Sequence, residues 1–202
     1  MHKIVTISRE FGSGGRELGK RLAEELGIPC YDHQIIEMIA KENGFDERYV
    51  ANVSEKSIEA AYPMTIGHRF AMPSMEIMEQ PIRVAAAQRQ IIENFAKQGD
   101  CVIIGRCADY VLDGTEGLIR VFLYADIKVR EERVRERNLY ADKDVLKNIH
   151  RIDRERRDYN RYYAGRDWEK PENYDLLINT TQIGVDGSVQ LIKDYLKMRG
   201  LL

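Results

Sequence analysis

Short runs of apolar residues alternate with segments of helical periodicity along most of this chain. The apolar runs are flanked by glycine or charged residues, which is typical of short buried strands. The pattern predicts strands over residues 3–8, 28–31, 101–105, 118–124 and 174–179. It predicts helices over residues 17–26, 33–44, 82–97, 127–139, 143–161 and 185–198. Strands that alternate with helices indicate an α/β fold with a parallel sheet and right-handed crossovers.

The alternation fails between Ser54 and Pro81. No helical or strand period is visible there, and proline recurs through the stretch. Methionine is also frequent, at Met64, Met72, Met75 and Met78. We interpret the stretch as an irregular insert over the core, or as an interface through which copies of the chain form a homo-oligomer.

Composition narrows the class of protein. A chain of 202 residues with 32% charged and 44% hydrophobic residues can form one globular domain with a large core. The net charge of −2 gives no general attraction to nucleic acid or to an anionic membrane. We therefore expect small-molecule partners, with no nucleic acid polymer and no membrane.

Cysteine usage and hydropathy predict a cytoplasmic location. Cys30, Cys101 and Cys107 are odd in number and lack CxxC spacing, so we expect reduced thiols and neither a zinc site nor disulfides. No apolar stretch reaches the roughly 18 residues that span a bilayer, and the N-terminal residues do not read as a signal peptide.

A glycine-rich segment joins the first predicted strand to the first predicted helix. Gly12, Ser13, Gly14 and Gly15 precede a helix whose N-terminal amides would point toward a bound anion. Glycines allow phosphate oxygens to approach the backbone closely, because no Cβ is in the way. The segment resembles a phosphate-binding loop.

Two residues of this segment depart from the usual phosphate-binding loop. Arg16 stands where the lysine belongs, and it keeps a positive charge with a different geometry. Glu17 stands where a serine or threonine would contact Mg²⁺, and a carboxylate is also a suitable oxygen ligand. The first glycine of the usual pattern is replaced by Glu10.

Two other interpretations of the loop are open on pattern alone. The glycines could form an ordinary tight turn between strand and helix. A dinucleotide-binding fold is the other alternative, because Asp32 follows the second strand at a distance suited to a ribose-binding acid. That fingerprint lacks its third glycine, where Glu17 stands.

Arginines recur at helical spacing in the second half of the chain. They are Arg151, Arg154, Arg157 and Arg161, three or four residues apart. Such a stripe lies along one helix face and suits a dense anion such as a triphosphate. The alternative is a solvated face, because acidic residues are interleaved with the arginines.

Three separated blocks together resemble the cytidylate kinase-like family, which is related to the nucleoside monophosphate kinases. The blocks are ISREFGSGGRELGKRLAEELGIPCYD, CVIIGRCADYVL and DRERRDYNRYY followed by NYDLLINTT, and the resemblance covers nearly the whole chain. It implies a three-layer P-loop kinase core with a five-stranded parallel sheet, a helical monophosphate-binding insert and a mobile lid. Within one domain, the core would comprise residues 1–31, 99–150 and 172–202, the insert 32–98 and the lid 151–171.

The resemblance also implies an activity and a set of site residues. The family transfers the γ-phosphoryl group of ATP to CMP or dCMP with Mg²⁺, so the expected cofactors are ATP and Mg²⁺ and the partners are nucleotides. The implied catalytic residues are Arg16, Arg157 and Arg161. ATP would be held by Gly12, Ser13, Gly14, Gly15, Arg16, Glu17, Arg154 and Thr180, with Glu17 placing the metal. The acceptor would be held by Asp32, Arg106, Asp109 and Asp158.

One departure from the family pattern affects recognition of the acceptor base. In ordinary cytidylate kinases a carboxylate directly follows the arginine at the end of the third strand, and here that position is Cys107. Asp109 is the nearest replacement. Arg69, Arg83 and Arg89 in the insert are further candidates for the acceptor phosphate.

Two other functions remain open on the sequence. The altered loop residues Arg16 and Glu17 are compatible with a nucleotide-binding protein that has lost catalysis and acts through a partner. A kinase of small hydroxy-metabolites could share the same core.

Overall fold

The computed structural model of the chain describes residues 2–53 and 75–202. Its centre is a parallel sheet of five strands in the order β2-β3-β1-β4-β5. The strands are β1 (Ile4–Arg9), β2 (Cys30–Tyr31), β3 (Cys101–Ile104), β4 (Leu118–Tyr124) and β5 (Leu176–Asn179). β1 lies between β3 and β4, with Ile4 paired to Cys101 on one side and to Leu118 on the other. The predicted five-stranded parallel sheet is confirmed.

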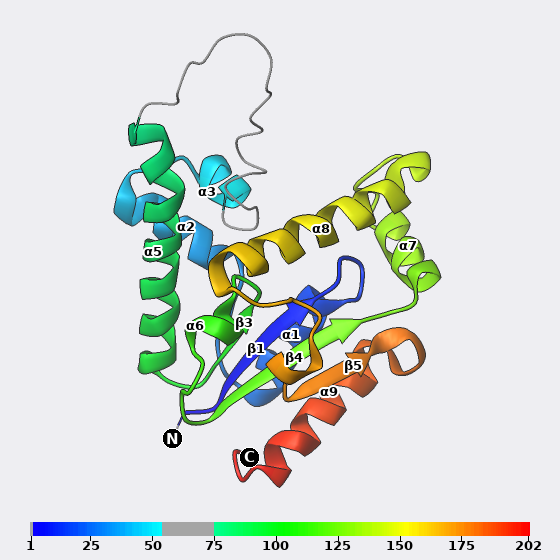
Figure 1. The fold of residues 1–202 in the computed structure, drawn as a ribbon. Coiled ribbons are helices and arrows are strands. Elements are labelled where there is room, and N and C mark those ends of the chain that lie inside the picture. The colour runs from blue at the N-terminus through cyan, green and yellow to red at the C-terminus, as the bar shows by residue number, and fades with distance from the viewer. Residues whose placement is uncertain (1, 54–74) are drawn as a thin grey trace.

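Helices cover both faces of this sheet, which gives three layers (Figure 1). α1 (Gly15–Leu26) and α9 (Thr180–Met198) pack on one face. On the other face lie α2 (His33–Asn43), α3 (Glu47–Val53), α5 (Met75–Gln98) and α6 (Ala108–Val111). Short 3₁₀ turns at Asp142–Asp144 and Pro171–Asn173 precede α8 and β5.

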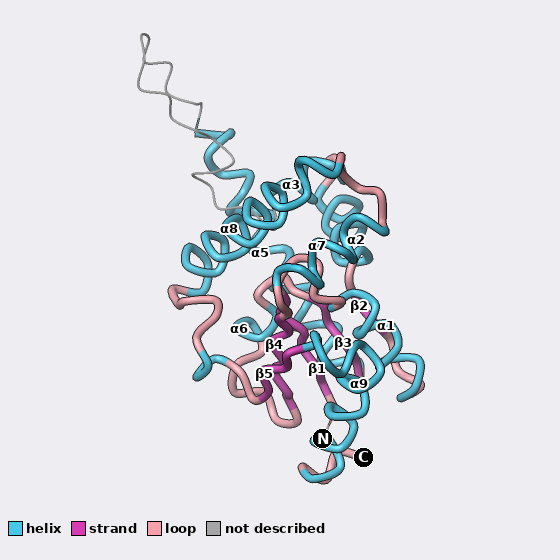
Figure 2. The backbone as a smooth tube through the Cα atoms, turned by 90° about the vertical axis from the view of Figure 1, so that its right-hand side faces the viewer, coloured by secondary structure: helices cyan, strands magenta, loops and turns pink. Residues whose placement is uncertain are grey.

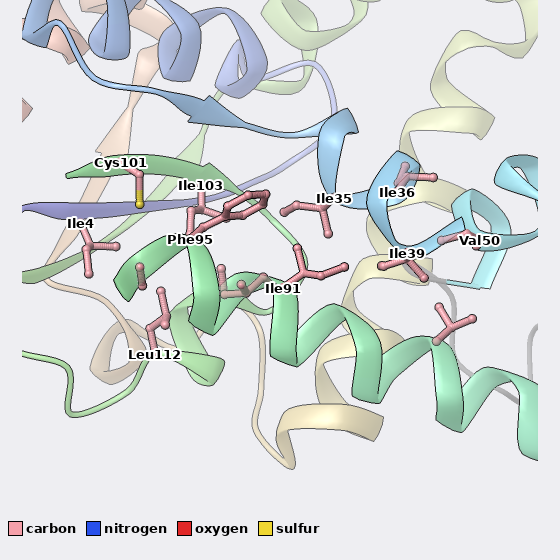
Figure 3. Close-up of a cluster of buried hydrophobic side chains, with 14 of the residues drawn as sticks. Ile4, Ile35, Ile36, Ile39, Val50, Ile91, Phe95, Cys101, Ile103 and Leu112 are labelled. Carbon is pink, nitrogen blue, oxygen red and sulfur yellow. The ribbon is translucent and has the colours of Figure 1, made fainter. Parts of the chain in front are cut away.

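The side chains of β1 alternate between the two layers. Val5 and Ile7 belong to the cluster with α1 and α9, whereas Ile4 belongs to the cluster with α2 and α5. Figure 3 shows this second cluster, in which Phe95 of α5 lies beside Ile103 of the sheet. The ring of Phe95 stacks on Tyr31 with centroids 3.6 Å apart.

Two further helices stand at the carboxyl edge of the sheet. α7 (Ile127–Glu136) follows β4, and α8 (Val145–Ala164) runs back across the ends of the strands (Figures 1 and 2). Glycine in the left-handed conformation ends α8 at Gly165. Ligands in open α/β sheets collect at this edge, so α8 lies directly over the place where a site is expected.

The stretch that lacks sequence periodicity includes the first residues of a helix. α5 begins at Met75, so the expectation of an irregular segment up to Pro81 is wrong for its last part. Pro81 lies within that helix, although proline usually ends a helix, and for this reason the sequence pattern placed the start of the helix too late. Residues 54–74, with Met64, Met72, His68 and Arg69, lie outside the described residues. Self-association through the methionine-rich stretch stays a prediction.

The second helix starts where it was predicted and the last one starts earlier. Asp32 occupies the cap position of α2, and its side chain makes no capping hydrogen bond. α9 begins at Thr180 and is kinked at Gly184, so the predicted helix from Val185 is its second part. The division into core, insert and lid stays a prediction. Among the helices described, none is long and apolar enough to cross a bilayer.

Candidate active site

The glycine-rich segment forms the turn between β1 and α1. Gly12 and Gly14 have φ angles of 85° and 94°, in the left-handed region that glycine tolerates. A Cβ at Gly14 would lie 2.8 Å from Nη1 of Arg133 on α7. The first backbone bond of α1 runs from the amide of Leu18 to the carbonyl of Gly14. The amides of residues 15–17 therefore have no acceptor within the helix and fit the oxygens of a phosphate.

Ser13 and Thr180 support this loop from inside the protein. Both are buried. The hydroxyl of Ser13 donates to the carbonyl of Glu10 at 2.9 Å, and the carbonyl of Ser13 accepts from Oγ1 of Thr180 at 2.9 Å. Thr180 is the first residue of α9, so the loop is attached to the far end of the chain. The side chains of these two predicted nucleotide-binding residues shape the loop.

Arg16 is directed toward the end of β2. Its Nε lies 2.6 Å from Oδ2 of Asp32, whose side chain is 11% exposed. The structure thus joins two residues that the sequence assigned to different substrates. Glu17, in the first turn of α1, has its carboxylate 3.3 Å from Arg21 and 4.0 Å from Arg137. Glu17 remains half-exposed beside the loop amides.

A buried ionic cluster connects the loop to α7 and α8. The guanidinium of Arg130 contacts Glu10 at 3.0 Å and Asp153 of α8, and it donates to the carbonyl of Phe11 at 2.8 Å. Asp153 in turn accepts from the amide of Phe11 at 2.7 Å. Burial raises the pKa of Glu10, although the charge of Arg130 opposes that rise. The cluster fixes the loop relative to both helices.

The end of β3 makes a strained turn. Gly105, Arg106 and Cys107 have consecutive φ angles of 73°, 61° and 51°. For the two that are not glycine, this conformation costs on the order of 1–3 kcal/mol each, and such strain concentrates at functional sites. The turn places Arg106, only 7% exposed, at the carboxyl edge of the sheet. The thiol of Cys107 donates to Oδ1 of Asn160 on α8 at 3.3 Å.

Asp109 lies inside the protein, on α6. It is 1% exposed, and its carboxylate is bound by Arg166 from the segment after α8. Burial raises the pKa of Asp109, and the charge of Arg166 opposes that rise. Arg166 also lies over the ring of Tyr110, 5.4 Å from its centre. Asp109 therefore anchors the segment after α8 beside the site.

An aromatic pocket of about 350 Å³ lies between α5, α6 and α8. Four tyrosines line it, Tyr110, Tyr159, Tyr162 and Tyr163, together with Arg106, Cys107 and Gln88. The amide nitrogen of Gln88 donates to the carbonyl of Arg106 at 3.0 Å and to the hydroxyl of Tyr159 at 2.8 Å. Aromatic walls with a few polar groups are typical of sites for small organic ligands.

Two of the predicted site arginines of α8, Arg157 and Arg161, have acidic partners in this structure. Arg157 contacts Glu169 at 2.6 Å and Arg161 contacts Asp167 at 3.2 Å, both in the segment that follows the helix. The bond to Glu169 raises the pKa of Arg157. Arg154 lines a cavity of about 590 Å³ between α7 and α8. Asp158 is half-buried on the same helix.

Two further arginines that the sequence analysis did not single out lie at the site. Arg133 lies over the glycine loop and donates to Oγ1 of Thr180 at 3.4 Å. Arg156 donates to the carbonyl of Arg9 at 2.8 Å, at the end of β1. The available signal for Arg133 was the recurrence of arginine at positions 130, 133 and 137, three and four residues apart as on α8.

Comparison with known sequences identifies relatives over most of the chain. Residues 4–182 match the model of the cytidylate kinase-like family. A cytidylate kinase from Pyrococcus horikoshii is 30% identical over 94% of this chain and 86% of its own length. A cytidylate kinase from Thermococcus kodakarensis is 28% identical, covering 98% of this chain and 91% of its own.

Solved structures agree with the fold. An uncharacterized protein from Eubacterium ventriosum superposes with a TM-score of 0.72 at 25% identity, over 96% of this chain and 98% of that one. A shikimate kinase from Bacteroides thetaiotaomicron, at 14% identity, has a TM-score of 0.55 over 98% of this chain and 99% of its own, and it supports the fold alone. With its glycine loop, its parallel sheet and a family match over residues 4–182, this chain belongs to the cytidylate kinase-like family.

Proposed function

We propose that this protein transfers the γ-phosphoryl group of ATP to a nucleoside monophosphate, with CMP or dCMP as the preferred acceptor. The proposal rests mainly on one observation: the glycine loop and the aromatic pocket lie at the same edge of the sheet. The glycine loop follows β1, the aromatic pocket begins at the end of β3, and these strands are neighbours. Membership of the cytidylate kinase-like family supports a nucleotide kinase activity.

The ATP phosphates would lie on the amides of residues 15–17, at the positive end of the α1 dipole. Gly12 and Gly14 keep this surface open, and Arg133 is close enough to neutralise a phosphate oxygen. Arg154 faces the cavity beside the loop and would approach the nucleotide from α8.

Glu17 fits the role of a metal ligand. It is half-exposed and adjacent to the loop amides, and Mg²⁺ in nucleotide sites is held by one or two carboxylates together with phosphate oxygens. Bound Mg²⁺ would neutralise the charge of the phosphates. Glu17 would then exchange its contacts with Arg21 and Arg137 for the metal.

The acceptor would occupy the aromatic pocket. Tyrosine rings bind a nucleobase by stacking on its face. Arg106 would bind the acceptor phosphate, and Asp32 and Asp158 would contact the nucleoside. Asp109 would act on this site through Arg166 and Tyr110, because its own carboxylate is buried. Cys107 and Asn160 supply the polar groups nearest the position of the usual carboxylate.

The proposed reaction needs few catalytic groups. The acceptor phosphate is already an anion, so the reaction requires no general base. Catalysis then depends on positioning and on neutralising negative charge. Arg157 and Arg161 would leave Glu169 and Asp167 to contact the phosphates when nucleotides bind.

A coupled assay of ADP release tests the proposal. ATP, Mg²⁺ and a panel of nucleoside monophosphates and small hydroxy-metabolites are supplied to the full chain. We expect turnover with CMP or dCMP to exceed that with the other acceptors. Turnover only on a hydroxyl compound would identify a small-metabolite kinase. Binding of ATP without turnover on any acceptor would identify a nucleotide-binding protein.

A further inference from the structure

Arg16, at the lysine position of the loop, contacts a residue outside the loop. Arg16 reaches away from the loop to Asp32, at 2.6 Å, and its side chain is 60% exposed. A phosphoryl group in transfer needs positive charge at the point where the two nucleotides meet. Positive charge at that point therefore has to come from residues other than Arg16.

Arg9 lies at that meeting point. It is the last residue of β1 and directly precedes the loop. A Cβ at Gly15 would lie 2.7 Å from Cγ of Arg9, and a Cβ at Gly105 would overlap its Nη1. The side chain therefore runs from the start of α1 to the end of β3, through space that two glycines leave open.

Two further guanidinium groups share this place. Arg9, Arg106 and Arg156 line one narrow cavity together with Gly105 and Trp168. Arg156 reaches it from α8 and is held by its hydrogen bond to the carbonyl of Arg9 and by the ring of Phe11, 5.8 Å from its Cζ. Three arginines from three elements concentrate positive charge over the ends of β1 and β3.

The cavity joins the acceptor pocket. Arg106, Cys107 and Tyr159 line both of them. On the other side, Arg9 lies against Gly15 of the glycine loop. The arginine cavity, with a volume of about 10 Å³, thus lies between the place proposed for the ATP phosphates and the place proposed for the acceptor.

We propose that Arg9 contacts the phosphoryl group during its transfer; this inference rests on the proposed function. An oxygen of the acceptor phosphate forms a bond to the γ-phosphorus while the bond from that phosphorus to the β–γ bridging oxygen breaks. The electron pair of the broken bond stays on ADP. Total charge is unchanged and no proton is transferred. Arg9 binds the oxygens of the moving group, as a planar guanidinium can with two bonds at once.

Arg9→Ala tests the inference, with Arg199→Ala as the control, an exposed arginine whose side chain contacts Tyr195 on α9. We expect Arg9→Ala to lower kcat by on the order of 10³-fold, as loss of an arginine that contacts the transferred group does, while the Kd for ATP changes less than about threefold. Methylguanidinium added to the solution should restore part of the activity of Arg9→Ala and leave the activity of the control unchanged. Turnover of Arg9→Ala within about threefold of wild type would overturn the inference and leave the proposed function intact.

Gly105→Ala displaces Arg9 without removing it. Gly114→Ala is its match, because Gly114 has a similar φ of 76° and open space around it, so the backbone strain is comparable. We expect Gly105→Ala to lose kcat as Arg9→Ala does and Gly114→Ala to keep it. Equal activity of the two glycine variants would overturn the placement of Arg9.

Trp168 provides a readout that does not depend on turnover. It is the only tryptophan in the sequence and lines the arginine cavity, so its fluorescence reports an anion bound there. In a titration with inorganic phosphate, Arg9→Ala should weaken the response at least about tenfold and Arg199→Ala should not. If wild type turns over no acceptor, the proposed function fails, and this titration still decides whether Arg9 binds an anion. Identical titrations of wild type and Arg9→Ala would overturn the inference.

Discussion

At the scale of single residues, the candidate site differs from the usual phosphate-binding loop in the direction of its arginine side chains. Arg16 stands at the lysine position but contacts Asp32, whereas Arg133 of α7 comes within reach of Gly14. The position of Arg16 in the sequence pattern therefore did not tell which group its side chain contacts. The absence of a side chain at Gly14 is what lets a charge from another element reach the loop.

Gly14→Val should abolish ATP binding while the protein stays folded. A β-branched side chain would fill the space of a phosphate oxygen and meet Arg133, and its φ of 94° would add backbone strain. Calorimetry with ATP and circular dichroism measure the two properties. Gly44→Val is the control, since Gly44 has a φ of 68° with nothing near it. Unchanged ATP affinity in a folded Gly14→Val protein would exclude the phosphate-loop interpretation.

Glu17→Ala should weaken nucleotide binding far more with Mg²⁺ than with EDTA. A carboxylate that places the metal matters only when the metal is present. Glu24→Ala, an exposed acid on the same helix, controls for the change in charge. If the loss were the same in both conditions, Glu17 would act only as an acid at the helix N-terminus, where it interacts with the dipole.

At the scale of elements, α8 is connected to both proposed substrate sites. Its Asp153 binds the backbone of the glycine loop, and its Asn160 accepts from Cys107 at the end of β3. Its outer arginines Arg157 and Arg161 contact the segment that follows it. The helix therefore joins the glycine loop to the end of β3.

Arg157→Ala and Arg161→Ala should lower kcat severely and change ATP affinity only modestly. Interactions made mainly in the transition state affect the rate more than ground-state binding, and loss of such an arginine costs on the order of 10³-fold. Steady-state kinetics and calorimetry separate the two effects. Arg135→Ala on α7, where Arg135 is paired with Glu131 at the surface, should have neither effect. Near-normal turnover of both α8 variants would mean that their stripe is a solvated face.

The ion pair between Arg120 of β4 and Asp175, just before β5, should make part of the folding stability depend on pH. Asp175 is half-buried, and burial alone would raise its pKa. The bonds that it accepts from Arg120, at 2.8 and 3.2 Å, outweigh burial and hold the pKa below its ordinary value. The stabilisation is therefore present above the unfolded pKa of about 3.9 and is lost as the pH falls through the lower folded value.

Asp175→Asn should reduce the free energy of unfolding by about 1–3 kcal/mol at pH 7, and the difference from wild type should shrink as the pH falls below about 4. Urea unfolding at several pH values measures it. Asp113→Asn removes an exposed partner of the same Arg120 and should cost less than about 1 kcal/mol. A difference that stays constant down to pH 3 would contradict the role given to the carboxylate.

At the scale of the whole molecule, the period of the apolar residues and the position of glycines and charged residues predicted the strands and most helices. Each strand is a short apolar run between charged or glycine residues. The pattern could not show that Pro81 lies within α5, since the helix continues through it. Nor could it pair Arg16 with Asp32 or bring Arg9 beside Gly105. Those contacts depend on the order of strands in the sheet, which sets β1 against β3. The sequence could therefore propose candidate site residues, but it could not give the partners that these residues contact.

The bond between Thr180 and the carbonyl of Ser13 joins residues 167 positions apart. During synthesis Thr180 is translated 167 residues after Ser13. At 5–20 residues per second the interval is on the order of ten seconds. Nascent chains of intermediate length have the loop sequence without this brace. If the loop binds ATP as proposed, ATP would therefore stabilise the chain only after Thr180 is in place, and not the shorter nascent chains.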